Sequence, residues 1–180
     1  ATLTWSWKDN AFSETGYEIL RATDLAPLSE ILPANTTEWT QSGLTPNSSS
    51  QIIVRGFNGF GHRDSVISPV RWTLAAPPRE TTVVSATGTT VQLSWSANGN
   101  PVGTPYGVEK SAEGFSFSLV SVTTSPFATI TDLIDGTTTY FRVRGENANA
   151  VPTAYDNVVA VFLPPKTPPT APDQLLVETR

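Results

Sequence analysis

Residues that could carry out chemistry are few in this sequence, and they do not form a recognisable catalytic arrangement. The one histidine, His62, lies in the segment Gly59-Phe60-Gly61-His62-Arg63-Asp64. Next to Asp64 it could act as a general base or a metal ligand, but a glycine-rich turn between two strands is sufficient reason for polar residues there. A Ser-His-Asp site would also need a nucleophile elbow or an oxyanion hole, and the sequence resembles neither.

Cysteine and paired carboxylates are the other usual sources of reactivity. The chain has no cysteine, which excludes disulfides, thiolate metal sites and cysteine nucleophiles. The acidic pairs Asp132 with Asp135 and Glu30 with Glu38 lack the dense Asp-x-Asp spacing of a calcium loop. We therefore predict that the protein is not an enzyme and has no catalytic residue, no metal and no cofactor.

Aromatic side chains outside the expected core are the best candidates for binding. Phe60 and Tyr155 fall in loops, where their rings could stack on a sugar or anchor a protein interface. For Trp39 and Trp72 we favour a role in the core or at an interface between modules.

Charge and hydropathy limit the class of partner. The 180 residues include 11 Lys and Arg against 16 Asp and Glu, a net charge of −5, which repels phosphate backbones. The longest apolar stretches, such as residues 158–163, are far shorter than the roughly 20 residues that cross a bilayer. We expect neither nucleic acid as a partner nor a membrane span. Asn35-Thr36-Thr37 and Asn47-Ser48-Ser49 fit the N-glycosylation pattern, whose use depends on the source.

The elements that position these residues are expected to be strands. Apolar residues recur at every second position, as in Leu3, Trp5 and Trp7, and the alternating segments are separated by clusters of Asn, Gly, Pro and Ser. Residues 25–32 could form one helical turn, but the prolines at 27 and 33 argue against more. This pattern predicts an all-β fold of antiparallel sandwiches.

The sequence also repeats itself at a spacing of about 90 residues. The matching landmarks are Leu3-Thr4-Trp5 with Leu93-Ser94-Trp95, Tyr17 with Tyr106, Leu44 with Leu133, and Val54-Arg55-Gly56 with Val143-Arg144-Gly145. Proline-rich segments at 75–78 and 163–172 follow the two copies and are expected to be stiff spacers.

Each copy resembles the fibronectin type III module, a β-sandwich of immunoglobulin-like type. The resemblance rests on a strand-B Trp, a strand-C Tyr, a corner Leu and the apolar residues of strand F; these are Trp5, Tyr17, Leu44, Ile52 and Val54 in copy one, and Trp95, Tyr106, Leu133, Phe141 and Val143 in copy two. Two positions depart from the family, since Ser50 and Thr139 stand where it carries a corner Tyr. Tyr140 comes one position late and is expected to face outward.

The repeat divides the chain unevenly. We predict a module at 1–75 that lacks its own strand A, a complete module at 76–165 whose strand A is residues 80–85, and at 166–180 a proline-rich linker with a lone strand A. Three explanations stay open for this offset: an excerpt from a longer array, addition of residues 171–180 to copy one of a neighbouring subunit, or folding back within the chain. In the second, Leu175 and Val177 dock near Leu3 and Trp5.

The family resemblance implies packing more than ligand chemistry. We expect a non-catalytic structural or adhesive pair of modules at the cell surface or outside the cell, with a fibre assembled head to tail as one form. The alternative is a spacer or accessory binding module of a secreted polysaccharide-degrading enzyme. The expected partners are other copies of the chain, neighbouring modules, or a protein or carbohydrate surface.

Overall fold

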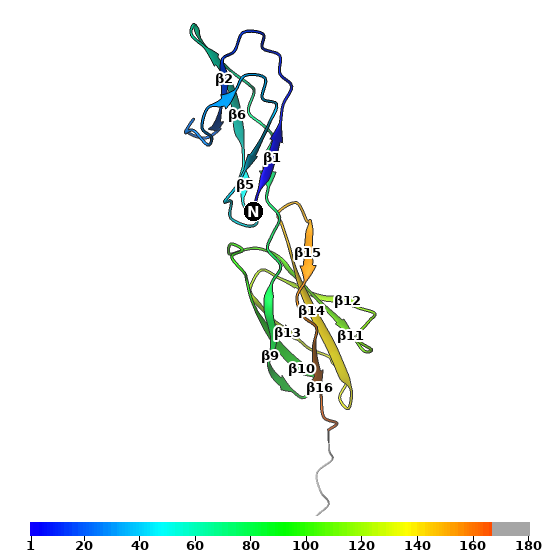
Figure 1. Ribbon diagram of the computed structural model, residues 1–180. Helices are drawn as coiled ribbons and strands as arrows, with labels where there is room; N and C mark the ends of the chain where they lie inside the picture. Colours follow the sequence, from blue (N-terminus) through cyan, green and yellow to red (C-terminus); the bar gives the residue numbers. More distant parts are fainter. Residues whose placement is uncertain (167–180) are drawn as a thin grey trace, which may run out of the picture.

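A computed structural model describes residues 1–166, and in that range every regular element is a β-strand (Figure 1). The first eight strands are β1 (Leu3–Ser6), β2 (Gly16–Arg21), β3 (Leu32–Pro33), β4 (Glu38–Gln41), β5 (Ser49–Ser50), β6 (Ile52–Asn58), β7 (Gly61–Asp64) and β8 (Arg71–Trp72). The other eight are β9 (Arg79–Thr87), β10 (Thr90–Ser96), β11 (Tyr106–Ser111), β12 (Ser118–Thr123), β13 (Phe127–Ile130), β14 (Thr138–Glu146), β15 (Pro152–Tyr155) and β16 (Val159–Phe162).

The second group of strands forms a complete antiparallel sandwich. One sheet has the order β13-β10-β9, and the other has the order β12-β11-β14, with β15 and β16 both paired to β14. Strand β9 covers the predicted strand A, residues 80–85. Buried residues of both sheets meet in one core that includes Leu93, Val108 and Phe141. The burial pattern of β14 alternates along all nine residues, as expected for a strand with one face in a core.

The first group repeats this plan, except that β9 has no counterpart in it among the described residues. Its larger sheet has the order β3-β2-β6-β7, while β1 pairs with β4 alone and β5 with β8. Its core cluster is smaller, with Trp5, Ile19 and Ile52 buried and Leu3 and Trp7 partly buried. The structure confirms the predicted fold, two tandem antiparallel sandwiches of fibronectin type III-like, immunoglobulin-like type. The two modules stack end to end (Figure 1), and the predicted boundary at residues 75 and 76 falls between β8 and β9.

One part of the predicted repeat register is wrong. Trp7, not Trp5, lies where Trp95 lies in the second module. The N–H of Trp7 donates to the carbonyl of Thr37, one residue beyond the last β1–β4 pair, and the N–H of Trp95 donates to the carbonyl of Pro126, one residue beyond the last β10–β13 pair. Each also packs edge-on against the strand-C tyrosine, with centroid distances of 5.9 Å for Trp7 and Tyr17 and 5.6 Å for Trp95 and Tyr106. The shift here is 95 minus 7, or 88.

Trp5 therefore occupies the position of Leu93. It is buried, and its Nε1 donates a hydrogen bond to Oε1 of Gln41 at 3.3 Å. The alternation of apolar residues made a two-residue slip invisible in the sequence, because such a slip leaves every side chain on the same face of the sheet. Tyr140 is half-buried and lies between the buried Thr139 and Phe141, so it faces outward as expected.

Removing the ring of Phe141 tests the core of the second module. This side chain is fully buried, so we expect Phe141→Ala to lower the free energy of unfolding of that module by about 3–5 kcal/mol, from lost burial and an unfilled cavity. Phe162→Ala, at an exposed position of the neighbouring strand β16, should cost about 1 kcal/mol or less. Urea denaturation of the two variants measures both values, and equal losses would contradict this description of the core.

Candidate functional site

The joint between the modules is held by hydrogen bonds from buried asparagine side chains. Asn47 is 7% exposed and lies in a turn of the first module with a φ of 47°, a left-handed conformation that asparagine tolerates better than most residues. Its Nδ2 donates to Oγ1 of Thr104 at 3.0 Å, and its Oδ1 accepts from the N–H of Ala148 at 2.9 Å. Both partners belong to loops of the second module.

Two asparagines of the second module bond to the first module and to the segment that connects the modules. Asn147, 3% exposed, donates from Nδ2 to the carbonyl of Thr73 at 3.2 Å, while its Oδ1 accepts two N–H groups of its own loop. Asn100, 8% exposed, accepts from the N–H of Ala76 at 2.7 Å and donates to the carbonyl of Ala76 at 2.8 Å. Ala76, in the segment that connects the modules, is thereby paired through both its N–H and its carbonyl group, as a residue in a β-ladder is.

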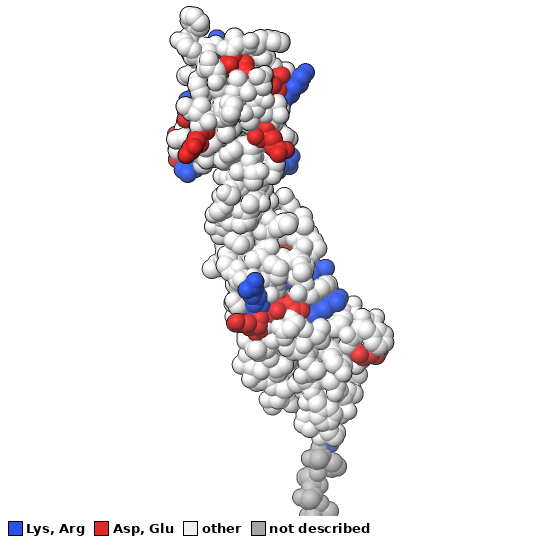
Figure 2. Space-filling view, in the orientation of Figure 1, with Lys and Arg blue, Asp and Glu red and all other residues white. Residues whose placement is uncertain are grey.

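These contacts constrain orientation more than simple apolar packing would. Hydrogen bonds require defined distances and angles. Leaving a buried amide without its partner destabilises the folded state by about 1–3 kcal/mol. The surface around the joint, the narrow waist between the two modules, is almost free of charged side chains on the face shown in Figure 2. Bending at the joint would break hydrogen bonds of buried groups, and no charged side chain lies nearby to serve as a new partner.

The same burial bears on the two glycosylation patterns. The Nδ2 of Asn47 is used in the joint, so a glycan on that atom is incompatible with the contacts described. Asn35 lies in an exposed turn of the first module.

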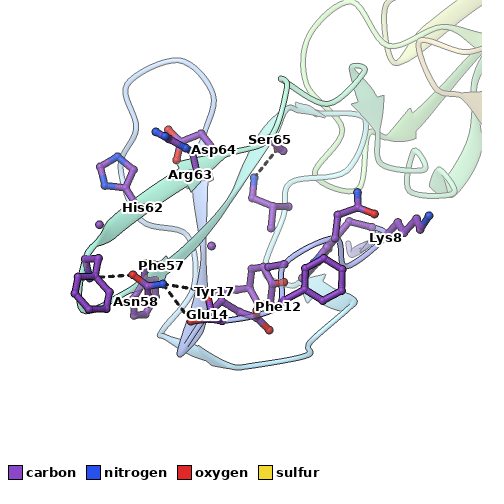
Figure 3. A pocket seen from close by; sticks show the side chains of 18 residues that line it. Lys8, Phe12, Glu14, Tyr17, Phe57, Asn58, His62, Arg63, Asp64 and Ser65 are labelled. Atoms are coloured by element: carbon purple, nitrogen blue, oxygen red, sulfur yellow. Dashed lines mark hydrogen bonds between the residues drawn. The ribbon is translucent and has the colours of Figure 1, made fainter.

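A second candidate site is an open groove of about 750 Å³ at the far end of the first module (Figure 3). Phe12 and Phe60, on two loops that border it, are 101% and 102% exposed. The groove is also lined by Trp7, Tyr17 and Phe57, and by polar side chains that include Asn10, Glu14, Asn58 and His62. It combines apolar ring faces with hydrogen-bonding groups and stays open to solvent.

Local hydrogen bonds hold both loops in place. The hydroxyl of Tyr17 donates to Oδ1 of Asp9, which also accepts the N–H of Ala11; the Tyr17 and Ala11 bonds lower the pKa of Asp9. Burial and the Asp9 carboxylate raise the pKa of Tyr17. On the other side, Asn58 donates from Nδ2 to the carbonyl of Ser13 at 3.1 Å and accepts the N–H of Phe60 at 2.9 Å.

His62 and Asp64 do not form a catalytic pair. Asp64 binds Arg55 through two hydrogen bonds of 2.7 and 3.0 Å, and the Arg55 guanidinium lowers the pKa of that carboxyl group. His62 stands exposed on the same strand (Figure 3). Among residues 1–166, no group of three or more His, Cys, Asp or Glu side chains is arranged to hold a metal ion, and no helix is long and apolar enough to span a membrane.

Tyr155 of β15 belongs to a side-chain cluster on the sheet that contains β11 and β14 of the second module. Its hydroxyl donates to Oε1 of Glu109 at 2.7 Å. The Arg142 guanidinium lies 3.8 Å from the centroid of the Tyr155 ring and 4.1 Å from that of Phe117, and it donates to Oε2 of Glu109 at 2.7 Å. Arg142 thus covers the ring of Tyr155, which we predicted from the sequence to be a ligand contact.

Sequence reasoning missed this cluster and the asparagine joint. A usable signal for the cluster was the charge alternation in Arg142, Arg144 and Glu146, because alternate residues of one strand share a face. For the joint no comparable signal exists, since its partners are up to 101 residues apart. Leu175 and Val177 lie outside the described residues, whereas their predicted docking region, Leu3 and Trp5, is in β1.

Comparisons with known proteins identify relatives among the glucanases. The chain is 27% identical to exoglucanase B of Cellulomonas fimi over 96% of its length, and 33% identical to endoglucanase B of the same species over 55% of its length. It spans only 16% and 9% of those two proteins. No protein-family model matches the sequence.

Solved structures that are similar to this one include fibronectin type III domains. One is from human fibronectin type III domain containing protein 3, 22% identical, covering 53% of this chain and 91% of that one, with a TM-score of 0.45. Another is the chicken CNTN1 FN1-FN3 structure, 14% identical, covering 91% of this chain and 62% of that one, with a TM-score of 0.44.

Acidification tests the Glu109 cluster. Burial alone would raise the pKa of Glu109, but the bonds from Tyr155 and Arg142 outweigh it and lower the pKa below 4.5. A carboxyl group with a lowered folded pKa adds stability above its unfolded pKa, and that stability is lost as the pH falls through the folded value. We expect Glu109→Gln to destabilise the protein at pH 7 and the difference from the parent to shrink steadily below about pH 4.5.

Urea unfolding of the parent and the Glu109→Gln variant from pH 7 to pH 2.5 measures this difference. Glu113→Gln, at an exposed position of the same module, is the control and should show a smaller dependence. A Glu109→Gln penalty that stays constant with pH would show that the charge of Glu109 is not what the cluster uses.

Proposed function

We propose that this pair of fibronectin type III-like sandwiches is a non-catalytic spacer that holds parts of an extracellular polysaccharide-degrading enzyme at a set distance and orientation. The observation that carries this proposal is the joint, in which the buried side chains of Asn47 and Asn147 are hydrogen-bonded from one module to the other, while buried Asn100 pairs with Ala76 at the start of the second module. A spacer with a fixed angle needs such a joint, whereas a flexible tether does not.

The alignment with exoglucanase B supports the spacer role. The whole pair, 96% of the chain, aligns with a small part of a glucanase, as expected for a segment that accompanies a catalytic domain. The extracellular location follows from the same proposal, because polymeric glucans are met outside the cell. We also propose that the modules divide at residues 75 and 76, so that Ala76, paired with Asn100, begins the second module.

Loosening the joint tests the spacer. We expect Asn47→Ala combined with Asn147→Ala to leave both sandwiches folded and to widen the distribution of angles between them, because three hydrogen bonds across the joint are lost. Since the chain has no cysteine, one cysteine can be introduced in each module, at exposed Thr40 and exposed Leu119, and spin-labelled for distance measurements by pulsed EPR.

Asn58→Ala is the matched control, because Asn58 occupies in the first module the position that Asn147 has in the second, away from the joint. It should leave the inter-label distances unchanged. A broad distribution in the parent chain would contradict a fixed spacer directly, and an unaltered distribution in the double variant would show that the asparagines do not set the angle.

The aromatic groove supports a subsidiary proposal, that Phe60 and Phe12 contact the polysaccharide. Fully exposed rings can stack on pyranose faces, and nearby amide and carboxylate groups can bond to hydroxyls. We expect the Phe12→Ala, Phe60→Ala double variant to reduce retention of the chain on insoluble cellulose at least several-fold. Phe115→Ala, which removes an exposed ring from the second module, should not. Equal retention of all variants, or no retention of the parent chain, would contradict the contact.

The structural or adhesive role expected from the sequence, including a fibre, is a second candidate. The observation in its favour is that the two sandwiches stack end to end, as the repeating units of a fibre would (Figure 1). Electron microscopy of the purified chain separates the two roles: ordered filaments favour the fibre, and uniform short rods favour the spacer.

A further inference from the structure

Ion pairs between strands lie on the larger sheet of each module. In the second module Arg142 of β14 approaches Glu109 of β11 at 2.7 Å. In the first module Arg55 of β6 approaches Asp64 of β7, also at 2.7 Å. In both sandwiches the outer face of this sheet therefore carries both signs of charge, as the surface of a soluble protein usually does.

The smaller sheet of the second module, built from β13, β10 and β9, has an outer face of a different kind. The sequence has no charged residue at 81–108 or at 114–131, so the only charged residues of these three strands are Arg79 and Glu80, at the start of β9. Alternating burial along β10 and β13, and exposure along β9, identify the side chains that point outward. They include Thr82, Val84, Ser85, Gln92, Ser94, Phe127 and Thr129.

These side chains form rows across the three strands. Gln92 of β10 lies between Ser85 of β9 and Thr129 of β13. The hydroxyl of Ser85 donates to Oε1 of Gln92 at 3.1 Å, and in the next row the hydroxyl oxygens of Thr82 and Ser94 lie 3.3 Å apart. Hydrogen bonds within the rows hold the polar side chains in defined positions, so less conformational entropy is lost when a ligand covers them.

The smaller sheet of the first module repeats this kind of face. Its strands β1 and β4 turn Thr4 and Thr40 outward, with their hydroxyl oxygens 3.2 Å apart, and Ser6 is exposed as well. Glu38 is the one charged residue of these two strands. No buried core fixes the type of an outward side chain, so the hydroxyl groups common to both modules indicate a requirement of the surface itself.

We propose that the outer face of β9, β10 and β13 is a contact surface for a neutral polysaccharide. Hydroxyl and amide side chains donate and accept hydrogen bonds, as sugar hydroxyls do. Covering the rows of Gln92 and Ser94 removes no charged side chain from water, which would be costly. The ring of Phe127, 60% exposed, can lie against the apolar face of a sugar ring. The identity of this partner rests on the proposed function, whereas the surface is separate from the groove of the first module.

Other partners fit this face less well. A nucleic acid or an acidic polymer would need Lys or Arg side chains for its negative groups. Protein interfaces have a centre of large apolar or aromatic side chains. Here the large apolar side chains, Val84 and Phe127, stand on the two outer strands, and the polar Gln92 and Ser94 lie on the strand between them. A neutral polymer with many hydroxyl groups matches both the polarity of the face and its lack of charge.

Retention of the chain on insoluble cellulose, a neutral polysaccharide, tests the proposal. We expect Gln92→Glu and Gln92→Lys each to weaken binding about fivefold or more, because a charge of either sign would have to lose its water at the contact. Val122→Glu and Val122→Lys are the matched controls. Val122 is 63% exposed on β12 of the other sheet, and both changes there should leave binding within about twofold of the parent.

Using both signs of charge separates the possible partners. Stronger binding of the Gln92→Lys variant together with weaker binding of Gln92→Glu would overturn a neutral partner in favour of an anionic one. Unchanged retention of both Gln92 variants, equal losses in the Val122 variants, or a parent chain that cellulose does not retain would refute the contact face. Loss of self-association in sedimentation, with retention unchanged, would assign the face to a protein partner instead.

Urea unfolding of the Gln92 variants should give the same midpoint as the parent, so that weaker retention reports the surface and not the fold. The distances between spin labels are measured without polysaccharide. The contact face can therefore fail while the spacer stands, and a broad distribution of distances would contradict the spacer without bearing on the face.

Discussion

Buried amides must be hydrogen-bonded, and at the waist of this protein that requirement joins the two modules. The side chain of Asn47 bonds to two loops of the second module, and the side-chain N–H of Asn147 donates to the carbonyl of Thr73 in the first. The same side-chain oxygen of Asn147 also orders its own loop by accepting two N–H groups. One group of side-chain contacts thus connects the two modules and orders a loop of the second.

The cores of the two modules differ in size. The main cluster of buried apolar residues has eleven members in the second module and three in the first. A β-sandwich needs both faces covered to exclude water from its core. In the first module Leu3 and Trp7 are only partly buried, whereas Val91 and Trp95, at the same positions of the second, are buried.

The same loops serve different purposes in the two modules. At the joint the loops of the second module present amides and hydroxyls that bond to the first module. At the far end of the first module the corresponding loops present the exposed rings of Phe12 and Phe60 around a groove. Strand positions are shared because they fill a core, whereas loop residues diverge because nothing in the core depends on them. Specific contacts of this chain are for that reason found in its loops and at its edges.

The sequence by itself determined the all-β fold, the tandem repeat and the strand A of the second module, because alternation and turn residues are local properties. It did not determine the exact register of β1, where Trp7 rather than Trp5 matches Trp95, since a two-residue slip preserves the alternation. Only the tertiary structure brought together Asn47 and Ala148, 101 residues apart, or placed Arg142 over Tyr155. Such contacts depend on how strands and modules come together, and the spacing of residues along one chain does not contain that information.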